Sequence, residues 1–327
     1  MGGGAVLVLV IVFAAFQLSP WPGALLIRAF FDYDSARTAR ALEPHVPPNI
    51  VTRANLSYDD ADPDALLDLY LPAGEAGVSR ALPVIVWVHG GGWVSGSREN
   101  VGNYAKILAG AGHAVAAVGY SIAPRHTYPR PVQQVNAALA FLAANAAALE
   151  IDASRFVLAG DSAGAQIAAQ VATTISDPGY ADTIGIEPGL EPGQLCAMLL
   201  YSGAYDLASA NYAGIAGWFV RTVLWAYSGS ADFAGNPELA KASVIDFVTA
   251  EFPPSFISAG NGDPLLEQSV AFAARLKELG VEAETLFFPE SLSPALPHIY
   301  QFNLDTEGGQ EALRRSVDFL RSTLGAH

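Results

Sequence analysis

Gly160-Asp161-Ser162-Ala163-Gly164 sets one serine between two glycines in the middle of the chain. An apolar run, residues 155–159, precedes this stretch, and a helix-compatible run, residues 166–174, follows it. This order predicts a strand, a sharp turn and a helix, with the Ser162 hydroxyl at the apex of the turn. Glycines are needed on both sides because a Cβ would collide with the adjoining strand and helix. Glycine and serine are common in turns, so the pattern alone is only a weak indication of a nucleophile.

A second glycine-rich stretch, His89-Gly90-Gly91-Gly92-Trp93, lies upstream. It follows residues 82–88, an apolar and β-branched run that predicts a buried central strand. Consecutive glycines at a strand end expose consecutive backbone N–H groups, which can stabilise negative charge on a carbonyl oxygen during acyl transfer. The alternative is a flexible turn that only ends the strand. The serine turn downstream favours the oxyanion interpretation.

The candidates for a catalytic base are few, because only His298 and His327 follow Ser162 and His327 is the C-terminal residue. In enzymes built on this serine turn, an acidic residue and then a histidine follow the serine along the chain. His298 lies in a proline-bearing loop, residues 291–300, after a strand-like run at residues 284–288. We therefore predict that His298 is the base; the alternative is an ordinary surface histidine.

Two aspartates compete for the role of the acid that orients the histidine. Asp263 follows the strand-like run 254–260 and precedes a helix that begins near Pro264. It would accept the Nδ1 proton of the histidine and stabilise the imidazolium. A helix N-cap has the same local sequence, so a purely structural role stays open. The rival is Asp206, at the end of residues 201–206, but the geometric roles favour Asp263.

The ordered combination of motifs resembles the bacterial hormone-sensitive-lipase-like esterases of the α/β-hydrolase superfamily. The resemblance implies an α/β-hydrolase fold in which Ser162 is the nucleophile, His298 the base and Asp263 the acid. It covers residues 66 to 300, most of the chain, and its motifs are highly specific as a set. It rests on the stretches 89–93, 160–164 and 263–265, on His298, and on residues 67–72, the strand usually found shortly before the oxyanion loop.

The same resemblance implies the composition of the oxyanion hole. The backbone N–H groups of Gly91, Gly92 and Ala163 would form it, and His89 would brace the glycine loop without taking part in the chemistry. The resemblance implies no cofactor.

Two positions depart from the family's pattern. Ala165 stands where the family usually has a further glycine, and its methyl group narrows the approach between helix and strand. Ile299 follows His298 where glycine is more usual, which bears on the conformation of that loop and not on the imidazole.

Strand-like and helical runs alternate along the chain, which predicts a mainly parallel central sheet with helices on both faces. We expect residues 23–327 to form one catalytic domain. By the resemblance, residues 23–48 and an insertion between late strands, residues 207–250, are candidate elements of a cap over the site.

Aromatic residues of this insertion are candidates for substrate binding. Trp218, Phe219 and Trp225 lie on an amphipathic stretch, residues 215–227, and Trp93 adjoins the glycine loop. Aromatic side chains at helical spacing are core residues about as often, so ordinary packing is the alternative.

The charge balance is strongly acidic, with 17 Lys and Arg against 32 Asp and Glu and a net charge of −15. The sequence contains no basic cluster, which argues against nucleic acid as a partner and favours neutral substrates. Cys196 is the only cysteine, so no intramolecular disulfide can form. No metal-ligand spacing and no phosphate-binding loop is present, so we expect neither a metal nor a cofactor.

The N-terminal residues 1–22 contain an uncharged apolar run at residues 5–16. This run fits a signal-peptide core better than a full membrane span, which needs about 20 residues. We predict a signal or membrane-tethering segment, and with it a location in the cell envelope or outside the cell. The alternative is a docking segment on a cytoplasmic protein.

These features predict a carboxylic ester hydrolase that forms a serine acyl-enzyme, and the family resemblance implies short-to-medium acyl esters as its substrates. A carbohydrate or xenobiotic deacetylase, or a peptidase, could use the same triad and is the main alternative. A non-catalytic ligand-binding protein is a further alternative, but it should lack part of the machinery. A homodimer is compatible with the sequence.

Overall fold

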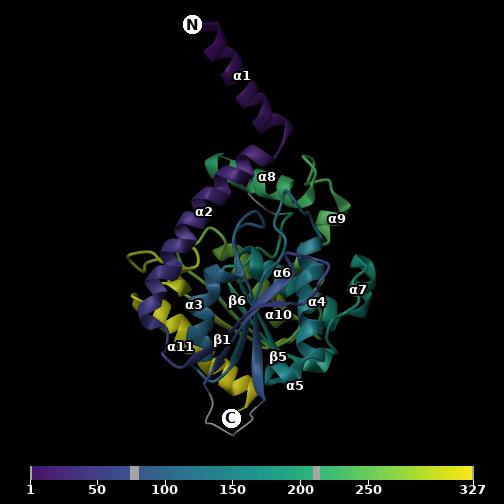
Figure 1. Cartoon of the computed structure of the whole chain (residues 1–327), viewed down its shortest axis with the longest axis vertical. Coiled ribbons are helices and arrows are strands. Elements are labelled where there is room, and N and C mark those ends of the chain that lie inside the picture. Colours follow the sequence, from purple (N-terminus) through teal and green to yellow (C-terminus); the bar gives the residue numbers. More distant parts are fainter. Residues whose placement is uncertain (1, 74–80, 209–213, 326–327) are drawn as a thin grey trace.

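A single sheet lies between two layers of helices in the computed structural model, which describes residues 2–73, 81–208 and 214–325 (Figure 1). The strand order is β1-β2-β4-β3-β5-β6-β7-β8. β2 pairs antiparallel with β1 and β4, and the remaining pairs are parallel. The predicted mainly parallel sheet flanked by helices is therefore confirmed. The strands are β1 (Ile50–Ser57), β2 (Leu66–Pro72), β3 (Leu82–Val88), β4 (Ala114–Val118), β5 (Ile151–Asp161), β6 (Leu195–Tyr201), β7 (Ser255–Ala259) and β8 (Ala283–Phe287).

The central strands are apolar throughout because helices cover both faces of the sheet. Strand β3 shows the alternation: Val84, Val86 and Val88 pack into one hydrophobic cluster, and Ile85 and Trp87 into the other. The first cluster contains side chains from α4 (Arg130–Ala144), α6 (Ala163–Ser176) and α10 (Leu266–Glu278), and the second from α3 (Arg98–Ala109) and α11 (Glu307–Leu324).

Three short helices complete the body: α5 (Ala146–Leu149), α7 (Pro178–Ile184) and α9 (Pro237–Ala240). The described residues also form four 3₁₀ turns, Glu43–His45, Pro192–Gln194, Val244–Asp246 and Tyr300–Phe302.

The two predicted cap elements meet at one end of the molecule. Helices α2 (Trp21–Leu42) and α8 (Gly214–Ser228) lie side by side there (Figure 1). The rings of Phe31 and Phe219 are in edge contact, with centroids 5.7 Å apart. Helix α2 begins at Trp21, so the predicted boundary at residue 22 falls inside it.

Helix α1 (Gly2–Leu18) projects away from the body (Figure 1). Its side chains from Val6 to Phe13 are each 48–69% exposed. In the described part of the chain, no single helix has the length and apolarity of a membrane span. The segments Val6–Leu18 and Trp21–His45 reach that threshold only together, as a pair bent by 87°.

Candidate active site

Ser162 occupies the sharp turn between β5 and α6, with φ 54° and ψ −120°. This conformation is sparsely populated for a residue with a side chain and costs about 1–3 kcal/mol. The flanking glycines make it possible. A Cβ on Gly160 would lie 2.6 Å from the carbonyl carbon of Gly164, and one on Gly164 would collide with the carbonyl oxygen of Val88. The Ser162 N–H donates to the Tyr201 carbonyl at 2.8 Å, which fixes the turn to β6.

Three side chains from three loops at the carboxyl edge of the sheet form one hydrogen-bonded chain. The Ser162 Oγ lies 3.0 Å from His298 Nε2, and His298 Nδ1 lies 2.9 Å from Asp263 Oδ1. The Asp263 side chain is fully buried, whereas the His298 side chain is 32% exposed. The structure thus brings together the three residues predicted as a triad, with the imidazole between the hydroxyl and the carboxylate.

The surroundings of Asp263 favour its ionised form. Burial by itself raises the pKa of this carboxyl, but the hydrogen bond and the charge of His298, together with further hydrogen bonds such as that from the Leu265 N–H, outweigh burial, so the pKa lies below its usual value. Asp263 Oδ1 also accepts the Leu265 N–H at 2.8 Å, just before α10. Helix α10 begins only at Leu266, and its N-cap, Leu265, has no side-chain hydrogen bond, so Asp263 does not cap the helix. One carboxylate oxygen serves both contacts.

Asp206 has different contacts in the loop after β6. Its N–H donates to Gln268 Oε1 at 2.9 Å, and its Oδ1 accepts the Ala208 N–H at 3.0 Å. Asp263, and not Asp206, is the carboxylate hydrogen-bonded to His298.

The glycine loop after β3 adopts backbone conformations that favour glycine. Gly91 has φ +119° and Gly92 has φ +58°, and a Cβ on Gly91 would collide with the Ser95 carbonyl. The Gly91 carbonyl accepts the N–H groups of Val94 and Ser95 at 3.2 and 3.0 Å, which close the loop into a tight turn. Ala163 is the first residue of α6, so its N–H has no intrahelical acceptor. The oxyanion hole itself stays a prediction.

Asp161, which sequence reasoning did not select, joins this loop to the serine turn. Its two carboxylate oxygens accept the Trp87 Nε1–H at 3.0 Å and the Gly90 N–H at 3.1 Å. Burial raises its pKa to about 6, although both hydrogen bonds and the nearby His298 oppose this rise. The side chain occupies the variable position of the glycine–serine motif, and the motif gives no indication of where it points.

The His89 side chain is buried next to the loop, at the edge of a cavity. Its ring stacks on Tyr120 with centroids 4.1 Å apart, and Nδ1 is 2.8 Å from the Gly90 carbonyl oxygen. The Tyr120 hydroxyl donates to the His89 carbonyl at 2.7 Å. Burial lowers the pKa of His89 to about 4, so the imidazole is neutral at neutral pH and can donate one hydrogen bond to the loop. This placement agrees with a bracing role.

Of the four aromatic residues expected in a substrate pocket, Phe219 is the one whose side chain packs over the glycine loop at Gly92. The position of a Cβ on Gly92 is 3.5 Å from the Phe219 ring, 3.6 Å from Phe31 and 3.4 Å from Val223. Sequence reasoning placed Phe31 in a cap segment but did not select it. Phe31 could have been selected as a hydrophobic residue on the side of the cap helix that faces the site.

The side chains of the three tryptophans have other surroundings. Trp93 is buried, stacks on Tyr227 with centroids 4.9 Å apart, and donates from Nε1 to Gln166 Oε1 at 3.1 Å. Trp225 packs partly buried against the core, and Trp218 is 40% exposed on α8. For Trp93 and Trp225 these contacts match the packing alternative.

The two departures from the family's pattern have clear positions. Ala165 is fully buried in the core cluster at the start of α6. Ile299 has φ 51° and ψ 34°, a left-handed conformation that favours glycine and is strained for a β-branched residue. Its side chain packs against the second core cluster, which helps to hold the loop that carries His298.

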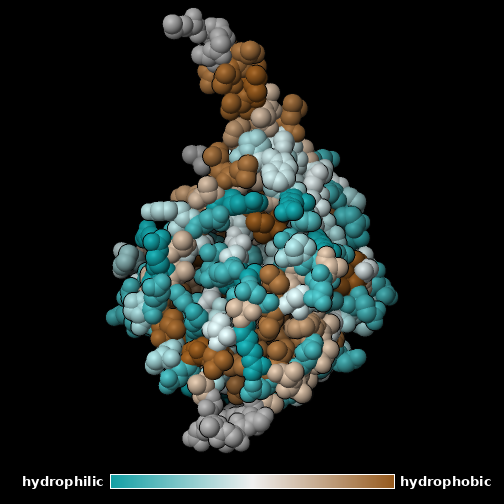
Figure 2. All heavy atoms as spheres, viewed as in Figure 1, coloured by the Kyte–Doolittle hydropathy of each residue, from teal (hydrophilic) through white to brown (hydrophobic). Residues whose placement is uncertain are grey.

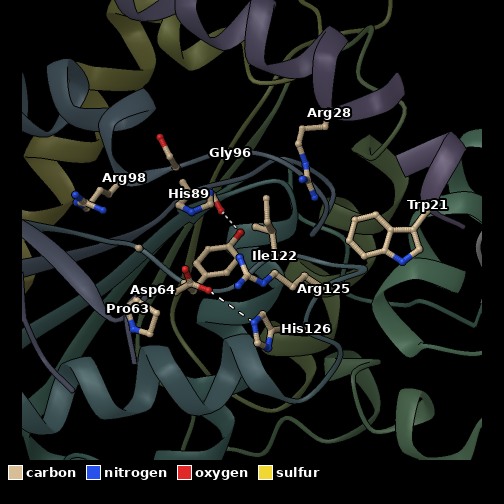
Figure 3. A pocket seen from close by; sticks show the side chains of 13 residues that line it. Trp21, Arg28, Pro63, Asp64, His89, Gly96, Arg98, Ile122, Arg125 and His126 are labelled. Carbon is tan, nitrogen blue, oxygen red and sulfur yellow. Dashed lines mark hydrogen bonds and ion pairs between the residues drawn. The ribbon is translucent and has the colours of Figure 1, made fainter. Parts of the chain in front are cut away.

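A cavity of about 510 Å³ lies beside the glycine loop, on the side of His89 and Tyr120 (Figure 3). Arg28 and Trp21 of α2 border it, and His126 Nε2 lies 3.9 Å from Asp64 Oδ2 on its wall. None of the three triad side chains lines it. Among the described residues, no group of three or more His, Cys, Asp or Glu side chains is arranged to hold a metal ion.

Comparison with known proteins agrees with this geometry. The model of a family described as having the alpha/beta hydrolase fold matches residues 85–293, which include the glycine loop, Ser162 and Asp263. The chain belongs to the α/β-hydrolase family. Its hormone-sensitive-lipase-like branch, expected from the motifs, is likewise confirmed.

Relatives from Mycobacterium tuberculosis extend the match along the chain. Esterase LipQ is 30% identical over 79% of this chain, which spans 61% of LipQ's length. Carboxylesterase NlhH is 29% identical over 88% of this chain and 89% of its own length. Among solved structures, esterase B of Lactobacillus rhamnosis superimposes with a TM-score of 0.77 at 24% identity, covering 93% of this chain and 97% of that protein. The structural likeness supports the fold.

Proposed function

We propose that this enzyme hydrolyses carboxylic esters with short-to-medium acyl chains through an acyl-enzyme on Ser162. The observation that carries the proposal is the hydrogen-bonded chain from Ser162 through His298 to the buried Asp263. A hydroxyl, an imidazole and a carboxylate in this order can generate a nucleophile at neutral pH.

The proposed reaction assigns one step to each of these groups. His298 Nε2 accepts the Ser162 proton as Oγ attacks the ester carbonyl, and the N–H groups of Gly91, Gly92 and Ala163 receive the developing oxyanion. Asp263 holds the Nδ1 proton and stabilises the imidazolium. The imidazolium protonates the leaving alcohol as the carbon–oxygen bond breaks. Water then attacks the acyl-enzyme while His298 takes its proton, and the acid leaves as Ser162 recovers its own.

Esters are the substrate class that the relatives support. LipQ and NlhH are named an esterase and a carboxylesterase, and the chain is accordingly a carboxylic ester hydrolase. Phe31, Phe219 and Val223 crowd the glycine loop at Gly92, which supports acyl groups of limited length. The deacetylase and peptidase alternatives would use the same residues and differ from the proposed activity in the group that leaves the acyl carbon.

Residues 1–22 form the proposed membrane tether of a protein of the cell envelope. The support is helix α1, whose apolar side chains from Val6 to Phe13 face solvent. Homodimer formation stays a prediction.

A series of p-nitrophenyl esters tests the proposed activity. We expect the highest kcat/KM on esters of short or medium acyl length, and a maximum on long-chain esters would contradict the acyl preference. Acetylated sugars and peptide amides, assayed alongside, should be slower. Ser162→Ala should lower kcat by about 10⁴-fold or more while the far-UV spectrum stays unchanged.

A further inference from the structure

The outer side of the cap carries an exposed apolar surface that continues into helix α1 (Figure 2). Among the described residues, only Val51 and Val270 are large, exposed hydrophobic side chains outside α1, α2 and α8 and the turn between α1 and α2. On α2 and α8 the exposed members are Trp21 (43%), Leu25 (49%), Leu26 (58%), Phe30 (67%), Tyr33 (69%) and Trp218 (40%). We call these six side chains the outer cap face.

Charge is missing from this end of the chain. Between residues 2 and 31 the only ionisable side chain is Arg28. Its guanidinium points inward, where Nε donates to the Val94 carbonyl at 2.7 Å and Nη2 to the Ala123 carbonyl at 2.9 Å. The outer side of the first turns of α2 is therefore apolar and without charge, which is unfavourable in water and favourable in lipid.

The geometry of α1 distinguishes a lipid bilayer from a second protein copy as the occupant. Consecutive side chains from Val6 to Phe13 are all exposed, so α1 is apolar on every side. A partner helix would cover only one side of it, whereas lipid would surround it. Its 17 residues form a rod of about 25 Å, which enters a hydrocarbon layer of about 30 Å but falls short of spanning it.

The bend between the two helices sets the orientation of the cap. The segments Val6–Leu18 and Trp21–His45 meet at 87°. If α1 follows the membrane normal, α2 lies parallel to the membrane surface, as interfacial helices do. Trp21 then lies at the corner, and Trp218 of α8 packs against Gly23 in the first turn of α2. Tryptophan is the side chain that prefers this depth of a membrane.

We propose that the outer cap face rests in the interface of a lipid bilayer and that the enzyme draws ester substrates from that bilayer. The proposal rests on the proposed function for its substrate. The inner side of α2 touches the glycine loop, because Asp32 accepts the Ser95 hydroxyl at 2.7 Å and Phe31 borders Gly92. One helix diameter, about 10 Å, therefore separates lipid from the oxyanion loop. The net charge of −15 favours zwitterionic over anionic lipid.

A fluorescent probe on the full chain tests the surface directly. In a Cys196→Ser background, Leu26→Cys carries an environment-sensitive nitrobenzoxadiazole group, and Val270→Cys, on the exposed side of α10, is the matched control. With phosphatidylcholine vesicles, the emission at position 26 should shift to the blue and be quenched by spin-labelled lipid, while position 270 stays unchanged. Equal, water-like emission at both positions would overturn the proposal. A blue shift that depends on protein concentration and not on vesicles would also overturn it, in favour of a second copy.

A paired activity assay tests the consequence for the substrate. Leu25→Glu with Leu26→Glu should lower the rate on an ester dissolved in phosphatidylcholine vesicles about tenfold, since charged side chains oppose insertion, and should leave p-nitrophenyl acetate hydrolysis within about twofold. Val270→Glu should change neither rate. An equal change on both substrates would refute the membrane route. Absence of hydrolysis on both substrates in the unmodified protein, with the probe shift present, would instead refute the proposed function alone.

Discussion

Two buried aspartates lie near Ser162, and their surroundings shift their pKa values in opposite directions. Asp161 precedes the serine in the chain, and Asp263 is linked to it through His298. Asp263 is hydrogen-bonded to His298 at the acid end of the proposed triad, and this contact helps to hold its pKa below the usual value. Asp161 lies under the glycine loop, where it accepts only neutral N–H groups and burial raises its pKa to about 6. In the proposed mechanism the Asp263 carboxylate interacts with an imidazole that becomes positively charged during the reaction. The Asp161 carboxylate instead connects the glycine loop to the serine turn through its hydrogen bonds.

The contrast separates chemistry from positioning. In the proposed mechanism the site needs a negative charge at Asp263 when the imidazolium forms, because that charge stabilises a transient cation. It needs acceptor oxygens at Asp161, because Gly90 and Trp87 must keep their places relative to Ser162. Substitution by asparagine removes the charge at either site, and the two variants should therefore fail in different ways.

The largest effect is expected for Asp263→Asn. Asparagine retains the shape but holds the imidazole in the wrong tautomer, so kcat should fall about 10⁴-fold with little change in KM. Steady-state kinetics on p-nitrophenyl acetate measure this. Asp206→Asn is the matched control and should stay within about twofold of the unmodified enzyme. A larger loss in the control would transfer the acid role to Asp206.

A smaller effect is expected for Asp161→Asn. Asparagine can accept from either Trp87 or Gly90 but presents an NH₂ group to the other, so the glycine loop shifts. Displacing the oxyanion donors should lower kcat about 10²-fold, while a fluorophosphonate probe should still label Ser162. Asp177→Asn, in which the side chain caps α7 by accepting the Gly179 N–H, is the control and should have no effect. Unchanged kcat in Asp161→Asn would show that Asp161 does not position the loop.

The smallest effect concerns the pH dependence of stability. Between the ordinary aspartate pKa of 3.8 and a pKa of about 6, the folded chain holds a proton on Asp161 that the unfolded chain has released. Asp161 thus destabilises the fold above pH 6, and this penalty is relieved as the pH falls through 6. Asp263 behaves in the opposite way: its contribution to stability is complete above 3.8 and is lost as the pH falls below that value.

Thermal unfolding of the two asparagine variants between about pH 4 and pH 7 measures this difference. The Tm of the unmodified chain relative to Asp161→Asn should rise by a few degrees as the pH falls from 7 to 5. The Tm difference between the unmodified chain and Asp263→Asn should stay constant over that range and should become smaller near pH 4. Parallel curves for both variants would mean that the two carboxylates do not differ in charge state.

Much of the site could be predicted because it follows from chain order. The strands β3, β5, β7 and β8 are parallel, so their carboxyl ends meet at one edge, and residues after each strand come together there. Ser162 and the glycine loop lie directly after apolar strands, and His298 lies in the longer loop that follows β8. For Asp263, local sequence alone left a rival, and a contact with His298 at 2.9 Å distinguishes the two.

The contacts of Asp161 and Trp93 could not be predicted, because they depend on register and backbone direction. Asp161 meets Trp87 and Gly90 only because β3 and β5 pair with Trp87 opposite Ala159 and Val88 opposite Gly160. Trp93 has φ 61°, and its ring is buried against Tyr227 and Gln166. No periodic pattern carries either fact. The apolar N-terminal run was evident, but the bend that turns the outer cap face away from the core was not.

The central claim is that Ser162 is the nucleophile, and labelling with a fluorophosphonate probe tests it most directly. After digestion, mass spectrometry should find a single adduct on Ser162, no adduct in Ser162→Ala, and slower labelling in Asp263→Asn. An adduct on any other residue, or equal labelling of Ser162→Ala, would contradict the claim.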